Sequence, residues 1–237
     1  MPSVLITGAA RRLGRILAEG FAERGWDVVI HYWRSAAEAQ QTERSLQRYG
    51  VRTLTIQGDL RKREHIERVF AYVTERWGAP DVLVNNAGVF PSPHPLHELS
   101  PERWEEALAV NLTACLYTSQ IFAAVQSAQG HIVNIASLGG LRTWRHRTAY
   151  NVSKAALLQL TRNLALELAP RIAVNAVCPG VLVLEPGEEP AIPVERIPAR
   201  RYGTGRDVFE AVYFFATATP YITGQWLIVD GGYHLVR

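Results

Sequence analysis

The sequence predicts an α/β fold of the doubly wound kind, with about seven mainly parallel strands and helices on both faces of the sheet. Short apolar segments alternate with longer amphipathic ones along the 237 residues, a pattern typical of strands joined by crossover helices. The strand candidates are continuous apolar runs, as expected where helices cover both faces. Neither a long linker nor an internal repeat divides the chain, so we expect a single domain over residues 1–237.

Each expected element has its own signal. Helix candidates place apolar residues three and four positions apart, as Ile66, Val69 and Val73 do. They cover the segments Arg12–Arg24, Ala36–Tyr49, Lys62–Trp77, Pro101 to about Gln126, and Ala149–Leu168. The strand candidates are Val4–Thr7, Asp27–Tyr32, Val51–Gln57, Asp81–Asn85, His131–Ala136, Arg171–Val177 and Trp226–Val229. A proline-rich stretch over 181–204 shows neither pattern, and a loop that long is usually functional or disordered.

Composition excludes several classes of protein. With 48% hydrophobic and 20% charged residues the chain is neither collagen-like, extensively disordered nor a disulfide scaffold. Its two cysteines, Cys115 and Cys178, lie in apolar stretches and are expected to be buried and reduced. We find no leader-like start and no apolar run near the roughly 18 residues that a membrane span needs. These features predict a soluble, cytoplasmic protein with no membrane partner.

The charge balance argues against nucleic acid as a partner. The formal net charge is only +3, and the basic residues alternate with acidic ones instead of forming a stripe. We therefore expect a small-molecule substrate. Nearly all of the 25 basic residues are arginine, the only lysines being Lys62 and Lys154, and Met1 is the sole methionine. That profile favours thermostability, although a GC-rich genome produces the same bias.

The turn between the first strand and the first helix has the features of a phosphate-binding site. Gly8 permits a tight turn, Gly14 lets the helix start pack closely, and the helix N-terminus offers unpaired N–H groups. We predict a dinucleotide cofactor here, held by Gly8, Arg12, Leu13 and Gly14. The alternative is an ordinary strand-to-helix turn.

The end of the second strand indicates which dinucleotide. An NAD site places an acidic residue there for the ribose 2′-hydroxyl, but the segment His31–Ser35 contains none. Arg34 and Ser35, with Arg12 from the first turn, could converge on a 2′-phosphate, which favours NADP(H). The alternative is that Arg34 faces solvent.

The next two strand ends supply further cofactor candidates. Asp59, followed by Leu60, could accept a hydrogen bond from the adenine amino group or cap the next helix. The small-residue turn Asn86, Ala87 and Gly88 would lie along the cofactor, or it could be any strand-end turn.

A tyrosine and a lysine supply the candidate chemistry. Tyr150 and Lys154 are four residues apart and share one helix face. An ammonium beside a phenol favours the phenolate, so we expect Lys154 to lower the pKa of Tyr150 and make it a usable acid or base. Such a pair alone is common on surface helices. The strand that ends at Ser137, 13 residues before Tyr150, makes the catalytic interpretation stronger.

Together with Asn111, Pro179–Gly180 and the terminal Val229–Gly232, these motifs resemble the short-chain dehydrogenase/reductase family over essentially the whole chain. The resemblance implies a Rossmann fold, usually a tetramer, and NAD(P)-linked hydride transfer at a carbonyl or imine group. It also makes Pro179 and Gly180 cofactor contacts and the 181–204 stretch a substrate-binding loop.

The resemblance further implies roles for four residues. Tyr150 is the proton donor, and Lys154 holds the nicotinamide ribose and tunes the tyrosine. Ser137 hydrogen-bonds the reacting oxygen, and Asn111 supports a water in a proton relay.

Within that family the chain looks most like the pteridine reductases. The first turn carries Arg12 where the common pattern has a middle glycine, and the segments His31–Ala39 and Asp230–Tyr233 are similar to that branch. The analogy implies an NADPH-dependent reductase, with a pterin stacked on Phe90 and held near Ser137 and Tyr150. Phe90 could equally be an apolar loop anchor.

Two departures keep other functions open. Ser137 stands where pteridine reductases often carry Asp, and Val181 follows Pro179–Gly180 where Thr or Ser is usual. A 3-oxoacyl-thioester or general ketone reductase is therefore the alternative enzyme. A non-catalytic NADP-binding sensor, suggested by Leu182 and its unusual loop, is the alternative of another class.

Two remaining features concern the mouth of the site and metals. The segment Arg142–Arg147 is expected to border the mouth of the active site, where it either binds an anionic or planar substrate tail or faces solvent or another subunit. His94 and His97 lie three apart, but no carboxylate or thiol pattern accompanies them, so we expect no metal.

Overall fold

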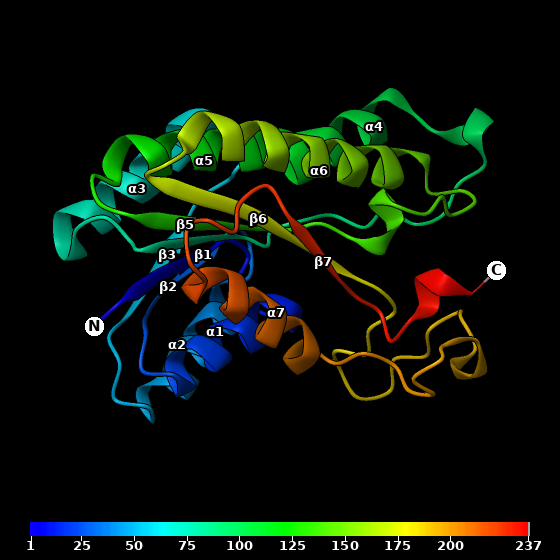
Figure 1. The fold of residues 1–237 in the computed structure, drawn as a ribbon, viewed down its shortest axis with the longest axis horizontal. Coiled ribbons are helices and arrows are strands. Elements are labelled where there is room, and N and C mark those ends of the chain that lie inside the picture. Colours follow the sequence, from blue (N-terminus) through cyan, green and yellow to red (C-terminus); the bar gives the residue numbers. More distant parts are fainter. Residues whose placement is uncertain (237) are drawn as a thin grey trace.

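The computed structural model describes residues 1–236, in which seven parallel strands form one sheet (Figure 1). The strand order is β3-β2-β1-β4-β5-β6-β7, which confirms the predicted doubly wound fold. The strands are β1 (Ser3–Ile6), β2 (Asp27–Tyr32), β3 (Thr53–Gln57), β4 (Val82–Asn85), β5 (Gly130–Ile135), β6 (Ile172–Pro179) and β7 (Trp226–Val229).

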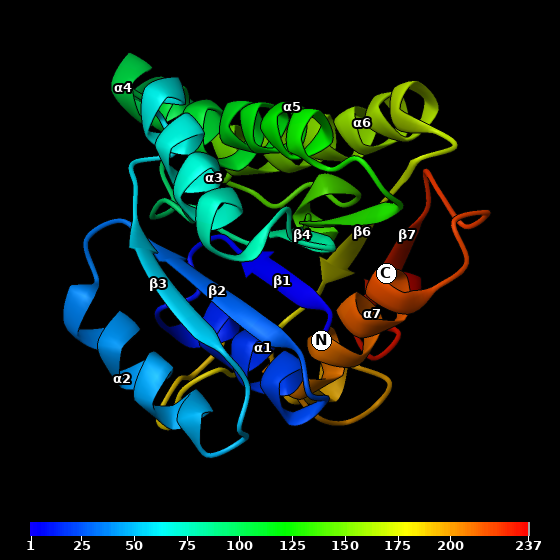
Figure 2. The ribbon, with the colours of Figure 1, turned by 90° about the vertical axis from the view of Figure 1, so that its left-hand side faces the viewer.

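Helices cover both faces of the sheet. One face carries α1 (Arg12–Glu23), α2 (Ala36–Gln47) and α7 (Gly205–Thr217), and the other carries α3 (Arg63–Trp77), α4 (Pro101–Leu108), α5 (Ala114–Val125) and α6 (Thr148–Leu168) (Figures 1 and 2). Short 3-10 turns lie at Leu96–Glu98, Leu138–Gly140, Val194–Arg196 and Tyr233–Leu235. Helix α7, which directly follows the 181–204 loop, has no counterpart among the predicted elements.

Successive residues of a strand pack into two separate hydrophobic cores, one on each face of the sheet. Val4 and Ile6 of β1 pack among α1, α2 and α7, whereas Leu5 between them packs toward α3, α5 and α6. All three side chains are fully buried. This two-sided burial is the reason that the strands read as unbroken apolar runs.

The sheet topology determines where a ligand can bind. The order reverses between β1 and β4, which are hydrogen-bonded neighbours although β2 and β3 lie between them in the chain. In open α/β sheets a crevice forms at the carboxyl ends of the strands on either side of this reversal. The turns after β1, β2, β3 and β4 therefore meet at one edge of the molecule.

The helical stretch over 101–125 corrects the expectation that no apolar run approaches the length of a membrane span. Counted from α4 through α5, it is long and apolar enough to cross a membrane by length and composition, with 33% of its most apolar window buried. The predicted single helix is also interrupted by a π-helical turn at Ala109–Thr113. The helix was expected, but not its apolar length, because polar residues interrupt the run in the sequence; α4 and α5 pack on α3, α6 and β4.

Packing between α1 and α7 can be tested by truncating Phe209. Its ring is fully buried, with centroids 5.5 Å from Phe21 and 5.6 Å from Tyr213. We expect Phe209→Ala to lower the free energy of unfolding by about 3–5 kcal/mol in urea titrations, because the cavity cannot fully collapse. Leu96→Ala, at a side chain that is 71% exposed, should change it by less than about 0.5 kcal/mol. A loss below about 1 kcal/mol for Phe209→Ala would contradict this packing.

Candidate active site

The turn after β1 is built for close contact with the loop after β4. Gly8 has φ +65°, and a Cβ added there would lie 3.0 Å from the Ala87 Cα. A Cβ at Gly14 would lie 2.1 Å from the Gly8 carbonyl oxygen. The Asn86 side-chain amide donates to the carbonyls of Thr7 (2.9 Å) and Gly8 (3.2 Å). No side chain caps the N-terminus of α1, so its N–H groups remain available to a ligand.

These loops enclose a cleft of about 650 Å³, within the range of small-molecule and cofactor sites. It brings together every predicted site residue except Asn111, which is fully buried. The predicted residues that line the cleft are Gly8, Arg12, Leu13, Gly14, Arg34, Ser35, Asp59, Leu60, Asn86, Ala87, Gly88, Phe90, Ser137, Tyr150, Lys154, Pro179 and Gly180. The glycine cradle and the size of the cleft fit a dinucleotide.

One end of the cleft carries a stack of cations on an indole. The Arg34 and Arg61 guanidinium carbons lie 3.6 and 4.2 Å from the centroid of the Trp33 ring. Arg61 also forms an ion pair with Asp59, with 2.7 Å between Nη2 and Oδ2. This hydrogen bond lowers the pKa of Asp59. Ser35 begins α2 without a capping bond from its hydroxyl, which leaves that hydroxyl available to a ligand.

Sequence reasoning missed Trp33 and Arg61 as site residues. The signal available in the sequence was the position of Arg61, two residues after Asp59 at the end of a strand. A basic side chain at that spacing can fold back onto the carboxylate.

Arg12 has different partners from Arg34. It adopts φ +52°, a left-handed conformation that favours glycine. Its Nη1 lies 2.5 Å from Glu188 Oε1 and 3.2 Å from Glu185 Oε2, both in the 181–204 loop. Glu188 in turn accepts the backbone N–H of Leu184 at 2.8 Å. In this structure Arg12 therefore ties the first turn to the loop, and its convergence with Arg34 stays a prediction.

Lys154 is buried in the same helix as Tyr150. Its ammonium donates to the Ile135 carbonyl at 2.7 Å, and burial lowers its pKa. Contrary to the sequence expectation, the pKa of Tyr150 is raised, because burial outweighs the opposing contributions. Those contributions come from the Ser137 hydroxyl and the charge of Arg147, both of which act to lower the pKa. Arg147 is thus the cation that acts on the phenol in this structure.

Asn111 braces the site from the π-helical turn. Its side-chain oxygen accepts the Val89 N–H at 2.8 Å, and its amide donates to the Val89 carbonyl and to Ser153 Oγ, each at 3.0 Å. The residue is fully buried. These bonds join the loop after β4 to α6, the helix that carries Tyr150 and Lys154.

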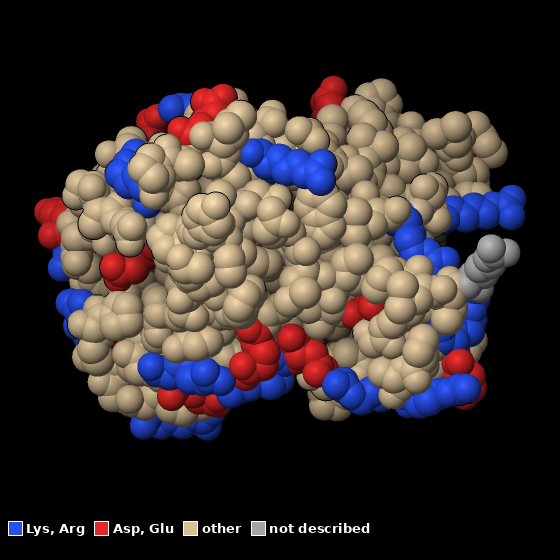
Figure 3. All heavy atoms as spheres, in the orientation of Figure 1, with Lys and Arg blue, Asp and Glu red and all other residues tan. Residues whose placement is uncertain are grey.

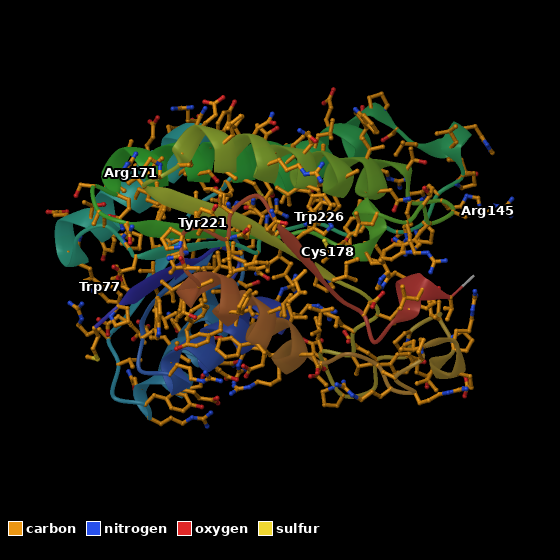
Figure 4. The ribbon with its side chains drawn as sticks, in the orientation of Figure 1. Trp77, Arg145, Arg171, Cys178, Tyr221 and Trp226 are labelled. Atoms are coloured by element: carbon orange, nitrogen blue, oxygen red, sulfur yellow. The ribbon has the colours of Figure 1, made fainter. Side chains whose placement is uncertain are left out.

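Aromatic rings surround Tyr150 at the mouth. The Trp144 ring lies parallel to it with centroids 6.1 Å apart, and the Phe90 ring meets it edge-on at 4.6 Å. Arg147 places its guanidinium 3.9 Å from the centroid of Phe90 and donates to the Pro91 carbonyl. Arg145, in contrast, projects outward at the edge of the molecule (Figure 4). The 142–147 segment is therefore divided between the mouth and the solvent.

Metal binding has no support among the residues described. Within 1–236 no group of three His, Cys, Asp or Glu side chains is placed to hold an ion.

Comparisons with known proteins identify the family. A family model described as enoyl-(acyl carrier protein) reductase matches residues 8–234. A 3-oxoacyl-(acyl-carrier-protein) reductase of Staphylococcus epidermidis is 31% identical over 242 residues, covering 98% of this chain and 99% of its own. The corresponding reductase of Staphylococcus aureus is 31% identical over 248 residues, covering 98% of both chains.

Solved structures of other proteins share this fold over nearly the whole chain. A short-chain dehydrogenase/reductase of Burkholderia xenovorans superposes with a TM-score of 0.93 at 28% identity, covering 99% of this chain and 98% of its own. A short-chain alcohol dehydrogenase of Sinorhizobium meliloti gives 0.93 at 30% identity, covering 100% and 97%.

The fold and site define a nucleotide-binding oxidoreductase. The chain belongs to the short-chain dehydrogenase/reductase family, whose enzymes use NAD(P)(H). This outcome favours an enzyme over the binding-only sensor. Both staphylococcal relatives are 3-oxoacyl reductases rather than pteridine reductases, so the similarity to the pteridine branch rests on the quoted segments alone.

The effect of Arg147 on Tyr150 can be tested through the pH dependence of carbonyl reduction. Since the Arg147 charge lowers the pKa of Tyr150, Arg147→Gln should raise that pKa further. A protonated tyrosine then persists to higher pH, and the alkaline limb of the kcat/KM profile moves upward in pH. The control Arg145→Gln removes the same charge from an exposed position and should leave the limb in place. Equal shifts in both variants would mean that only net charge matters.

Proposed function

We propose that this protein is an NADPH-dependent reductase of 3-oxoacyl thioesters or chemically similar ketones. The observation that supports this most is the neutral hydroxyl of Ser137, which lines the cleft with Tyr150 and acts to lower the pKa of that phenol. A ketone needs neutral donors at its oxygen, where negative charge develops during reduction. The 31% identity to 3-oxoacyl reductases supports the same substrate class.

The protonation state of Tyr150 supports the reductive direction. Because burial raises the pKa of Tyr150, the phenol stays protonated at neutral pH and can donate its proton to the substrate oxygen. When bound, the cofactor supplies the hydride. Ser137 orients the carbonyl oxygen, and Lys154 holds the nicotinamide ribose. Asn111 keeps the loop after β4 attached to α6, and we assign it a supporting role in proton relay.

The preference for NADPH rests on the cationic end of the cleft. Arg34, Arg61 and the uncapped Ser35 hydroxyl offer donors to a 2′-phosphate. The β2 end carries no carboxylate that would instead accept from a free 2′-hydroxyl.

A flat-ring substrate is the second candidate. Phe90 is 56% exposed at the mouth, and Trp144 presents a second ring nearby at 6.3 Å. Exposed rings of this kind suit stacking on a dihydropterin. This candidate needs a proton donor to a ring nitrogen, and Ser137 is less suited to that than a carboxylic acid.

We also propose that the protein self-associates as a tetramer in the cytoplasm. Figure 3 shows few charged side chains over the middle of the face toward the viewer. In the same orientation, Figure 4 places Tyr221 and Trp226 in this region. Tyr221 is 96% exposed, so this surface is suited to cover by another copy. Both cysteines are free and buried, which suits a reducing compartment.

We further propose that the protein is thermostable. Arg24, Glu210, Arg206 and Glu23 form a network of ion pairs between α1 and α7. Networks of this kind contribute more at high temperature than isolated pairs do.

An assay of reductase activity is the decisive experiment. With NADPH and an acetoacetyl thioester, we expect turnover that exceeds turnover with dihydrobiopterin, followed as loss of NADPH absorbance. Tyr150→Phe should lower kcat about 10²–10⁴-fold and leave the NADPH Kd nearly unchanged, because only the proton donor is lost. Turnover on the dihydropterin alone would favour the second candidate, and full activity in Tyr150→Phe would exclude the mechanism.

Cofactor preference is tested at Arg34. Arg34→Ala should weaken NADPH binding about 10-fold or more while leaving NADH binding within about twofold, because a charge-assisted hydrogen bond to phosphate is lost. The ratio of the two Kd values is the measurement. Equal weakening of both cofactors would show that Arg34 acts on the adenosine and not on the 2′-phosphate.

A further inference from the structure

A buried histidine lies beside the cleft, between the glycine turn and the end of β3. His31 lies on β2 with only 2% of its surface exposed. Its Nδ1 is 3.2 Å from the backbone nitrogen of Gly8, in the turn after β1. Its Nε2 is 3.1 Å from the carbonyl oxygen of Gly58, directly before Asp59. The ring therefore joins the glycine turn to the end of β3.

The two partners fix the protonation state of the ring. The Gly8 N–H can only donate, so Nδ1 must be a bare acceptor. The Gly58 carbonyl can only accept, so Nε2 must carry the proton. Only the neutral Nε2–H tautomer satisfies both bonds. Burial lowers the pKa of His31 to about 4, although the Gly58 bond and the charge of Asp59 act in the opposite direction.

The contact acts on Gly8, whose two flanking peptide units are both held by side chains. The Gly8 N–H is held by His31, and the Gly8 carbonyl accepts from Asn86 at 3.2 Å. The same carbonyl leaves no room for a side chain at Gly14. The orientation of these two peptide units therefore sets how the start of α1 meets a ligand, and His31 fixes the first of them from the β2 side.

We propose that His31 is a positioning residue for the dinucleotide, which holds the Gly8 turn in its binding conformation through Nδ1. The inference rests on the proposed function, in which this cleft holds NADP(H). His31 acts through Gly8, so its loss should weaken cofactor binding and spare the chemistry at Tyr150.

Two amide variants separate the two bonds of the ring. In His31→Asn the side-chain oxygen can occupy the place of Nδ1 and accept from Gly8. In His31→Gln the longer amide reaches the place of Nε2 and donates to Gly58, but the Gly8 N–H loses its acceptor. We expect His31→Gln to raise the NADPH Kd about 10-fold in fluorescence titrations, as for one lost hydrogen bond of about 1.4 kcal/mol. His31→Asn should stay within about threefold of the wild type.

The split between affinity and turnover distinguishes positioning from general destabilisation. At saturating NADPH, kcat of His31→Gln should stay within about twofold of the wild type. The control His131→Gln removes a partly buried imidazole from the start of β5 and should leave the Kd unchanged. A wild-type Kd in His31→Gln, or equal weakening in the Asn and Gln variants, would overturn the proposal.

A measurement on the wild type covers the case in which the variants do not fold. Nitrogen-15 NMR of the imidazoles should show His31 with a bare Nδ1 and a protonated Nε2, unchanged between pH 8 and 5.5. A midpoint near the ordinary value of about 6.5 would overturn the proposal. A wild type that binds neither NADPH nor NADH would instead overturn the proposed function, and the NMR result would still decide the His31–Gly8 contact.

Discussion

The approach of the turn after β1 to the loop after β4 is the constraint on which the rest of the site depends. A methyl group at Gly14 would collide with the Gly8 carbonyl, and one at Gly8 would crowd Ala87 at 3.0 Å. This contact is possible because β1 and β4 are neighbours where the strand order reverses. The loop after β4 is in turn tied to α6, because Asn111 bonds both Val89 and Ser153. The glycine turn and α6 are thus held by one continuous set of contacts.

The parts of the fold that sequence predicts well are those set by local periodicity and turn chemistry. The buried strands, the glycine turn and the Tyr150–Lys154 spacing all follow from residues close together in the chain. Helix α7 was missed although Thr204 and Asp207 form a capping box at its start. The proline-rich stretch directly before it obscures that signal.

Features that depend on tertiary contact could not be predicted. The stacking of Arg61 on Trp33 and the placing of Arg147 over Phe90 join segments distant in the chain. The expected effect of Lys154 on Tyr150 was wrong for a physical reason. Spacing puts the two on one helix face, but burial of the phenol, which spacing cannot reveal, outweighs any nearby charge.

The burial of Lys154 has a practical consequence for labelling. The chain has two side-chain amines, and Lys154 is only 5% exposed while Lys62 is exposed at the start of α3. Amine-directed reagents therefore distinguish the two by access alone. A dye coupled at Lys62 lies one residue from Arg61, beside the end of the cleft where arginines stack on Trp33, and needs no engineered cysteine. The arginine-rich composition thus leaves one accessible lysine side chain among the described residues, next to the cleft.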